Sequence, residues 1–148
     1  NIIIEISEYP PTSRMIDKII STLEQHEITY IIRKEINKFM KNIDLSGNAD
    51  RYEAMHNCLQ YGCNFLRDGK LYKCPFEALG NKFFEFFQLD IRLCGGVDIY
   101  NKELDWEKLV YSYEHEPVDA CKYCGEGEWF SWESSSSPIV DDWVVKSK

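Results

Sequence analysis

The sequence is poor in positive charge and contains no long apolar run. Its 148 residues include 25 Asp and Glu against 17 Lys and Arg, a formal net charge of −8 at pH 7. That charge repels a phosphate backbone and argues against a nucleic-acid partner. No apolar stretch approaches the roughly 20 residues that a membrane-spanning helix needs, and residues 1–7 lack the basic start and cleavage site of a secretory signal. We therefore expect a soluble, cytoplasmic chain with no membrane partner.

Common catalytic patterns are also missing. The sequence has no Ser, His and Asp in triad order, no phosphate-cradling glycine loop and no convincing acid–base pair. It holds three histidines but six cysteines. Because disulfides need an oxidising compartment, and no secretory signal is seen, metal ligation is the stronger interpretation of the cysteines.

The first third of the chain has the pattern of a βαβ unit. Asn1–Ser7 alternates Ile with polar residues, Met15–Leu23 has apolar residues at helical spacing, and Ile28–Ile36 is rich in β-branched residues. Two parallel strands cannot complete a sheet, and the chain begins without Met inside an apolar run. We therefore expect a piece of a longer α/β protein, with earlier strands upstream, or a small unit that packs on later residues.

Later segments predict a smaller, mixed region. The Asp68-Gly69 pair between two short apolar runs is the strongest local signal for a tight hairpin. The other predicted segments are a connector at 41–57, a helix at Phe76–Phe87, a helix at Asn101–Tyr113 with an apolar face of Leu104, Trp106, Leu109, Val110 and Tyr113, and a loop-like tail around Ser134–Ser137.

Four cysteines suggest one shared site. Cys121 and Cys124 form a C-x-x-C followed by glycine, a spacing that lets two thiolates reach one metal centre. Cys58 and Cys74 bracket the predicted hairpin and would complete a set of four thiolates. This set suits zinc and an iron–sulfur cluster equally well, and a redox-active thiol pair at the C-x-x-C remains a third reading.

The remaining candidates have plainer roles. Cys63 is the reserve ligand, although packing at the base of the hairpin is the expected role. Cys94 is expected to be a small apolar residue beside a turn, and His56 a polar loop residue.

The cysteine spacing resembles that of SPASM and Twitch domains. In these C-terminal extensions of radical S-adenosylmethionine (radical SAM) enzymes, a Cys–Gly–Cys hairpin precedes a C-x-x-C. Here ten residues separate Cys58 from Gly69, four separate Gly69 from Cys74, and Cys121 and Cys124 supply the later pair. The resemblance implies that these four cysteines bind one auxiliary [4Fe-4S] cluster.

The same resemblance implies a division of the chain and an α+β fold. Residues 1–45 would be the end of a partial (β/α) barrel, and residues 46–148 a small auxiliary-cluster domain made of a cysteine-anchored hairpin and helices. No cysteine follows Cys124, so one cluster is expected, as in the Twitch type. The C-x-x-x-C-x-x-C motif of the S-adenosylmethionine-binding cluster is missing. That cluster and S-adenosylmethionine are expected only in an upstream barrel, the predicted partner, and this chain alone should not cleave S-adenosylmethionine.

Three functions follow from these patterns. The first is an auxiliary-cluster region that supports electron transfer or substrate positioning in a radical SAM oxidoreductase. The second is a zinc-stabilised interaction module. The third is a thiol oxidoreductase that uses Cys121 and Cys124.

Overall fold

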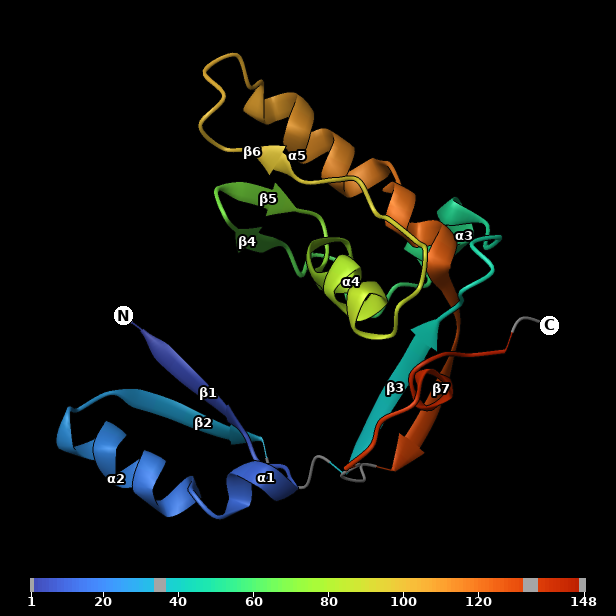
Figure 1. The fold of residues 1–148 in the computed structure, drawn as a ribbon. Coiled ribbons are helices and arrows are strands. Elements are labelled where there is room, and N and C mark those ends of the chain that lie inside the picture. Colours follow the sequence, from blue (N-terminus) through green and yellow to red (C-terminus); the bar gives the residue numbers. More distant parts are fainter. Residues whose placement is uncertain (1, 34–36, 132–135, 147–148) are drawn as a thin grey trace. The chain divides into compact units, whose positions relative to one another are not determined.

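The computed structural model describes residues 2–33, 37–131 and 136–146 of the chain (Figure 1). These residues form a mixed α and β fold, in which the strands make two sheets of two strands and one of three. The predicted α+β class is confirmed, whereas the origin of residues 1–45 as a barrel remnant stays a prediction. No helix in the described part of the chain is long and apolar enough to cross a membrane. The chain divides into two compact units: unit 1 is Asn1–Met40 with Trp129–Ser135, and unit 2 is Lys41–Glu128 with Ser136–Lys148.

Unit 1 contains the predicted strand–helix–strand. β1 (Ile3–Ser7) and β2 (Thr29–Arg33) pair in parallel. Because parallel strands need a crossover connection, α1 (Pro10–Ser13) and α2 (Ile16–Gln25) lie between them. The predicted βαβ order is confirmed over these strands, while residues 1 and 34–36 lie outside the described ones. The sequence did not predict α1, which begins at a proline, a residue favoured at the first helical position.

The predicted connector at 41–57 is wrong. It contains the end of β3 (Lys38–Ile43), which pairs with β7 (Cys124–Ser131), and the whole of α3 (Arg51–His56). The side chain of Asp50 caps α3 by accepting the backbone N–H groups of residues 52 and 53, each at 2.9 Å. A helix this short shows no apolar periodicity, and β3 pairs with a strand far along the chain, so neither element has a strong local signal.

The predicted hairpin is confirmed in unit 2. β4 (Phe65–Arg67) and β5 (Lys70–Tyr72) pair antiparallel, and β6 (Val97–Asp98) adds a third strand beside β5. Asp68 and Gly69 at the turn have φ of 50° and 73°. Both values are left-handed, as the two central positions of a tight hairpin turn of this kind require.

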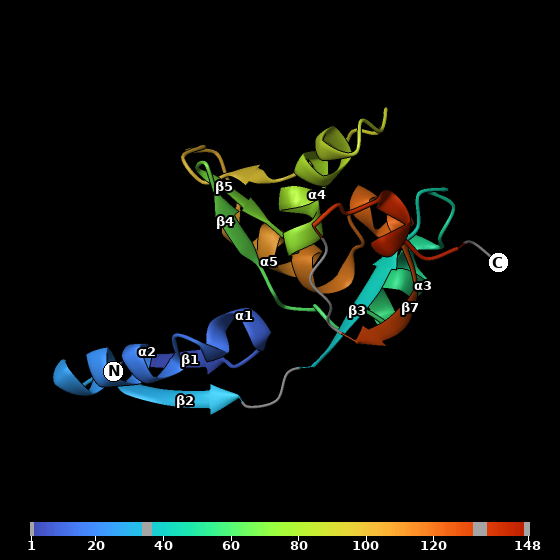
Figure 2. The ribbon, with the colours of Figure 1, turned by 60° about the horizontal axis from the view of Figure 1, so that its bottom comes forward.

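Helix α4 (Pro75–Phe86) supplies the centre of the core of unit 2, and its predicted position is confirmed. It packs beside the β4–β5 hairpin, as both ribbon views show (Figures 1 and 2). The buried residues Phe84, Leu93 and Ala120 form the core. Their partly buried apolar neighbours are Leu45, Phe76, Phe83, Leu89, Ile91, Val118 and Tyr123.

The second predicted helix of unit 2 begins later than expected. α5 runs over Trp106–His115, because the Asp105 side chain caps it by accepting the N–H of Lys108 at 3.1 Å. Of its predicted apolar face, Leu109 is buried, but Trp106 and Val110 are 50% and 54% exposed. The predicted apolar face is therefore only partly covered in the structure.

The tail contains more regular structure than its composition suggests. A 3-10 turn, η1 (Asp119–Tyr123), leads directly into β7, and a second one, η2 (Val140–Asp142), lies near the end of the chain. Ser134 and Ser135 of the predicted serine loop lie outside the described residues.

Candidate metal centre

Cys58 is held at the end of α3. Its backbone N–H donates to the carbonyl of Met55 at 3.2 Å, which continues the last turn of the helix. The loop that follows is tied to α5, since the Tyr61 hydroxyl donates to the carbonyl of Glu114 at 3.0 Å. The half-buried Cys58 thiol therefore sits on a segment fixed at both ends.

Cys74 caps the N-terminus of α4. Its Sγ accepts the backbone N–H of Glu77 at 3.4 Å, and Pro75 occupies the first helical position. Burial raises the pKa of the Cys74 thiol, while the amide hydrogen bonds from Glu77 and Phe76 work in the opposite direction. These amides point at the sulfur and would stabilise a thiolate there once a metal replaced the proton.

Cys121 and Cys124 lie on η1 and at the start of β7. The segment is anchored by backbone hydrogen bonds from Asp44 to the carbonyl of Tyr123 at 2.8 Å and from Ala49 to that of Lys122 at 3.0 Å. These bonds bring η1 against α3, so the end of the α3 segment and the C-x-x-C meet although they are far apart in sequence (Figure 1).

The four thiols are near enough for their charges to interact. Burial raises the pKa of Cys124 to about 12, and the negative charges of Cys121, Cys74 and Cys58 add to that rise. Burial also raises the pKa of Cys121, to which the charge of Cys58 again contributes. Each of these interactions would oppose ionisation of several thiols at once in a metal-free site, whereas a cation would favour it.

The two other cysteines differ from these four in how exposed they are. Cys63 and Cys94 are exposed, whereas the four predicted ligands are half-buried, and all six thiols are free. Cys63 is therefore not packed in the core at the hairpin base as predicted. Cys94 lies directly before Gly95 and Gly96 and is exposed, and its predicted role as a small apolar residue beside a turn stays a prediction. His56, at the last position of α3, is also exposed.

Two buried charged residues beside Cys74 were not predicted from the sequence. Lys73 and Glu77 are each 7% exposed, and the Glu77 carboxylate accepts the backbone N–H of Lys73 at 2.8 Å. Burial raises the pKa of Glu77 and lowers that of Lys73, and the charges of Cys121, Cys74, Glu77 and Cys58 oppose the latter shift. The available signal was the alternation of β5 (Lys70–Tyr72), which, continued by one residue, places position 73 on the same side as Leu71.

The Glu77 side chain also requires a glycine in the loop that follows α4. A Cβ on Gly95 would lie within 2.1 Å of Glu77 Oε1, so any larger residue would displace the carboxylate. The Gly95-Gly96 turn thus closes over the side chain that supports the backbone next to Cys74.

The donor set fits a thiolate-bound metal or cluster in its chemistry. Four half-buried thiols come from three segments of the chain, and burial raises the pKa values of Cys74, Cys121 and Cys124. In the part of the chain that the structure describes, no group of three or more His, Cys, Asp or Glu side chains is arranged so as to hold a metal ion. The thiols thus suit a metal or cluster in their chemistry, but their described positions do not form a coordination geometry.

The chain matches no protein-family model, no curated protein and no solved structure. The likeness to SPASM and Twitch domains accordingly stands on the cysteine spacing alone.

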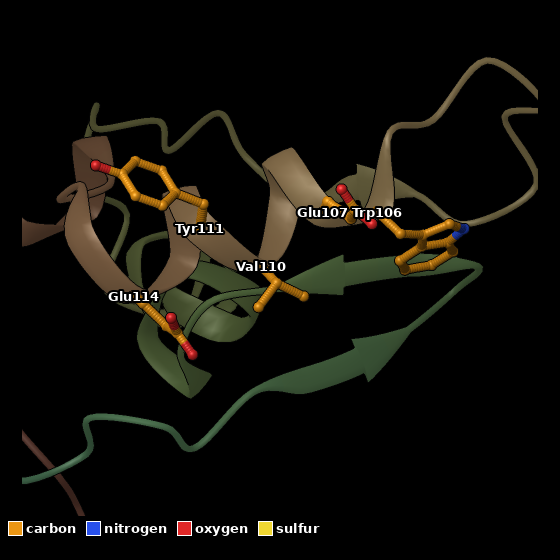
Figure 3. A pocket seen from close by; sticks show the side chains of 5 residues that line it. All are labelled: Trp106, Glu107, Val110, Tyr111 and Glu114. Carbon is orange, nitrogen blue, oxygen red and sulfur yellow. The ribbon is translucent and has the colours of Figure 1, made fainter.

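A shallow hollow on α5 is a separate feature of unit 2. Figure 3 shows its lining side chains, which all come from this one helix. They are Trp106, Glu107, Val110, Tyr111 and Glu114. The three apolar ones are each half exposed or more, so this face of α5 is open to solvent.

Proposed function

We propose that Cys58, Cys74, Cys121 and Cys124 bind one [4Fe-4S] cluster, and that the chain is the auxiliary-cluster region of a radical SAM enzyme. The observation that carries the proposal is the packing of η1, with its C-x-x-C, against α3, whose end holds Cys58. The charges of Cys121, Cys74 and Cys58, which add to the rise in the pKa of Cys124, support it. Two exposed cysteines stand outside the set. The choice of a cluster over zinc rests on the Cys–Gly–Cys and C-x-x-C spacing.

The chain's own residues would hold the cluster in a particular way. When bound, a cluster with four cysteine ligands supplies one-electron chemistry or structural support. The amide at Glu77 would donate to the sulfur of Cys74, and the core residues Phe84 and Ala120, each 1% exposed, would keep water from one side. Low polarity and hydrogen bonds to sulfur are the means by which a protein sets a cluster's reduction potential.

A thiol oxidoreductase is the less favoured reading of the C-x-x-C. Reactive thiol pairs have lowered pKa values, which make the thiolate available at neutral pH. Burial instead raises the pKa values of both Cys121 and Cys124. The pair is thus better suited to ligation than to nucleophilic attack on a disulfide.

The proposal includes a partner and a compartment. A barrel that binds S-adenosylmethionine and its own cluster would supply the radical chemistry, and a reducing compartment such as the cytoplasm would keep the thiols free. The parallel pairing of β1 and β2 supports this part, because parallel strands normally belong to larger sheets.

Anaerobic reconstitution tests the identity of the metal. The chain would be purified metal-free, then offered iron with sulfide, or zinc, or all together, and the bound elements counted. We expect about four iron and four sulfide per chain, with broad visible absorbance from sulfur-to-iron charge transfer. One tightly bound zinc per chain and no uptake of iron would contradict the proposal and favour the zinc-stabilised module.

A further inference from the structure

Lys73 is a buried cation at the cysteine site. Lys73 is only 7% exposed, and a lysine is almost never fully buried unless it is paired with an opposite charge. Among the described residues, the other buried charged side chains are Asp44 and Glu77, both acidic. The burial of a positive charge at this position therefore calls for a counterpart.

The Lys73 ammonium joins the segments that carry the cysteines. Its Nζ donates to the backbone carbonyl of Glu116, at the end of α5 and upstream of Cys121. The same atom donates to Sδ of Met55 at 3.1 Å, and the carbonyl of Met55 accepts the N–H of Cys58. Since Cys74 follows Lys73 directly, one side chain connects the three segments that carry the four cysteines.

In a loaded site, the counterpart in charge would be the set of thiolates. Four thiolates bound to an iron–sulfur cluster leave the site with net negative charge, and each electron that enters adds to it. A nearby positive charge stabilises the reduced form more than the oxidised form, especially in a partly buried site. Glu77 lies close as well, but its carboxylate accepts the backbone N–H of Lys73, so the ammonium remains directed toward Met55 and Glu116.

We propose that Lys73 is a positioning residue for the cluster, which fastens the segments of Cys58 and Cys121 beside Cys74 and whose positive charge raises the reduction potential of the cluster. This inference rests on the proposed function. The inference assigns a role to Lys73, a residue that is not part of any metal-binding cysteine motif.

The test is a measurement of reduction potential in the reconstituted chain. Wild type, K73Q and the control K70Q would be loaded with iron and sulfide, and their midpoint potentials measured by anaerobic spectroelectrochemistry. Lys70, the first residue of β5, lies three positions before Lys73 and is exposed, so K70Q removes the same charge from outside the site. We expect K73Q to lower the ratio of reduced to oxidised cluster about tenfold at a fixed potential, which is a shift of about 59 mV to more negative values for one electron. K70Q should stay close to wild type.

The outcomes separate this inference from the proposed function. If wild type takes up no iron, the proposed function fails and this role for Lys73 fails with it. If wild type is loaded but K73Q and K70Q have equal potentials, only the role of Lys73 is contradicted. If K73Q does not take up iron, K73R decides, because it keeps the charge: recovered uptake supports the role, and uptake lost equally in K73R overturns it.

Discussion

The two units of the chain differ in how much of their apolar surface they bury by themselves. In unit 1, Ile6 is buried at 7% exposure, while Ile3 and Ile31 of the same small sheet are 58% and 53% exposed. In unit 2, Phe84 and Ala120 are each 1% exposed and lie at the centre of a packed cluster. Unit 2 thus has a core of its own, and unit 1 has strands with little to cover them.

The difference bears on which unit would hold the candidate site. The segments that carry the four cysteines are held by the core of unit 2 and by hydrogen bonds within it. A parallel pair of strands with exposed isoleucines is what a sheet looks like when its neighbours are absent, since parallel sheets are normally covered on both faces. We therefore expect unit 2 to hold its site without unit 1, and unit 1 to depend on further strands.

The largest expected effect is the loss of stability that F84A causes in unit 2. Replacing a fully buried Phe by Ala should lower the free energy of unfolding by about 3–5 kcal/mol, because it removes buried surface and leaves a cavity. The measurement is chemical denaturation followed by tryptophan fluorescence. F86A is the matched control: Phe86 is on the same helix but 67% exposed, so the expected change is within about 0.5 kcal/mol. Equal effects of the two variants would show that unit 2 has no such core.

A second prediction compares the two units on metal loading. Hydrogen exchange would be measured on the metal-free and the iron–sulfur-loaded chain. Protection should rise around Cys58, Cys74 and η1, because ligation couples these segments and its free energy is gained only when they are folded. Amides of β1 and β2 should exchange at unchanged rates. A similar gain of protection in β1 would contradict the assignment of the site to unit 2 alone.

Local sequence signals accounted for part of this fold. The βαβ pattern, the Asp68-Gly69 hairpin and α4 each have a signal contained within a few residues, and all three were predicted. β3, β7 and α3 were missed because their stability comes from distant pairing and from the Asp50 cap. Trp106 falls on the apolar face of α5 but is 50% exposed. The spacing of apolar residues along a helix does not specify how much of that face the neighbouring elements cover.

Alkylation of the metal-free chain compares the reaction rates of the individual thiols. Cys63 and Cys94 are exposed and should react first with iodoacetamide near neutral pH. Cys74, Cys121 and Cys124 should react slowly, because burial raises their pKa values and keeps them protonated. Peptide mapping by mass spectrometry gives the order. Fast reaction of Cys121 and Cys124 would instead favour the thiol oxidoreductase.

The smallest expected effect is that of Y113F. The Tyr113 hydroxyl donates to the carbonyl of Leu71 at 2.7 Å and ties α5 to the hairpin. Its loss should cost about 1 kcal/mol of unfolding free energy. Burial raises the pKa of Tyr113 to about 12, above the ordinary value of about 10. Because the folded chain favours the neutral hydroxyl, Tyr113 makes its full contribution to stability below pH 10. That contribution is lost as the pH rises toward 12.

The comparison of Y113F with wild type isolates this group. Both chains contain the same cysteines, so the titration of the thiols cancels in the difference between their unfolding free energies. That difference should be constant up to about pH 10 and shrink above it. A difference that grows with pH would mean that the hydroxyl is not held in its neutral form.

The four cysteines of the candidate site are visible in the sequence, but their surroundings are not. The spacing of Cys58, Cys74, Cys121 and Cys124 is visible in the sequence, and the structure brings their segments together. Lys73 and Glu77 were not predicted, because charged residues are ordinarily exposed and their burial depends on the Gly95 turn and the end of α5.

The most direct test of the shared site is an exchange of single cysteines. Six Cys→Ser variants would be reconstituted anaerobically, and the iron and sulfide bound per chain counted. We predict that the variants at Cys58, Cys74, Cys121 and Cys124 lose most of the bound iron or bind a smaller, less stable cluster, because each removes a thiolate ligand. Those at Cys63 and Cys94, whose side chains are exposed, should load like wild type. Full loading after loss of Cys58 or Cys124, or lost loading in the variant at Cys63, would contradict the four-cysteine site.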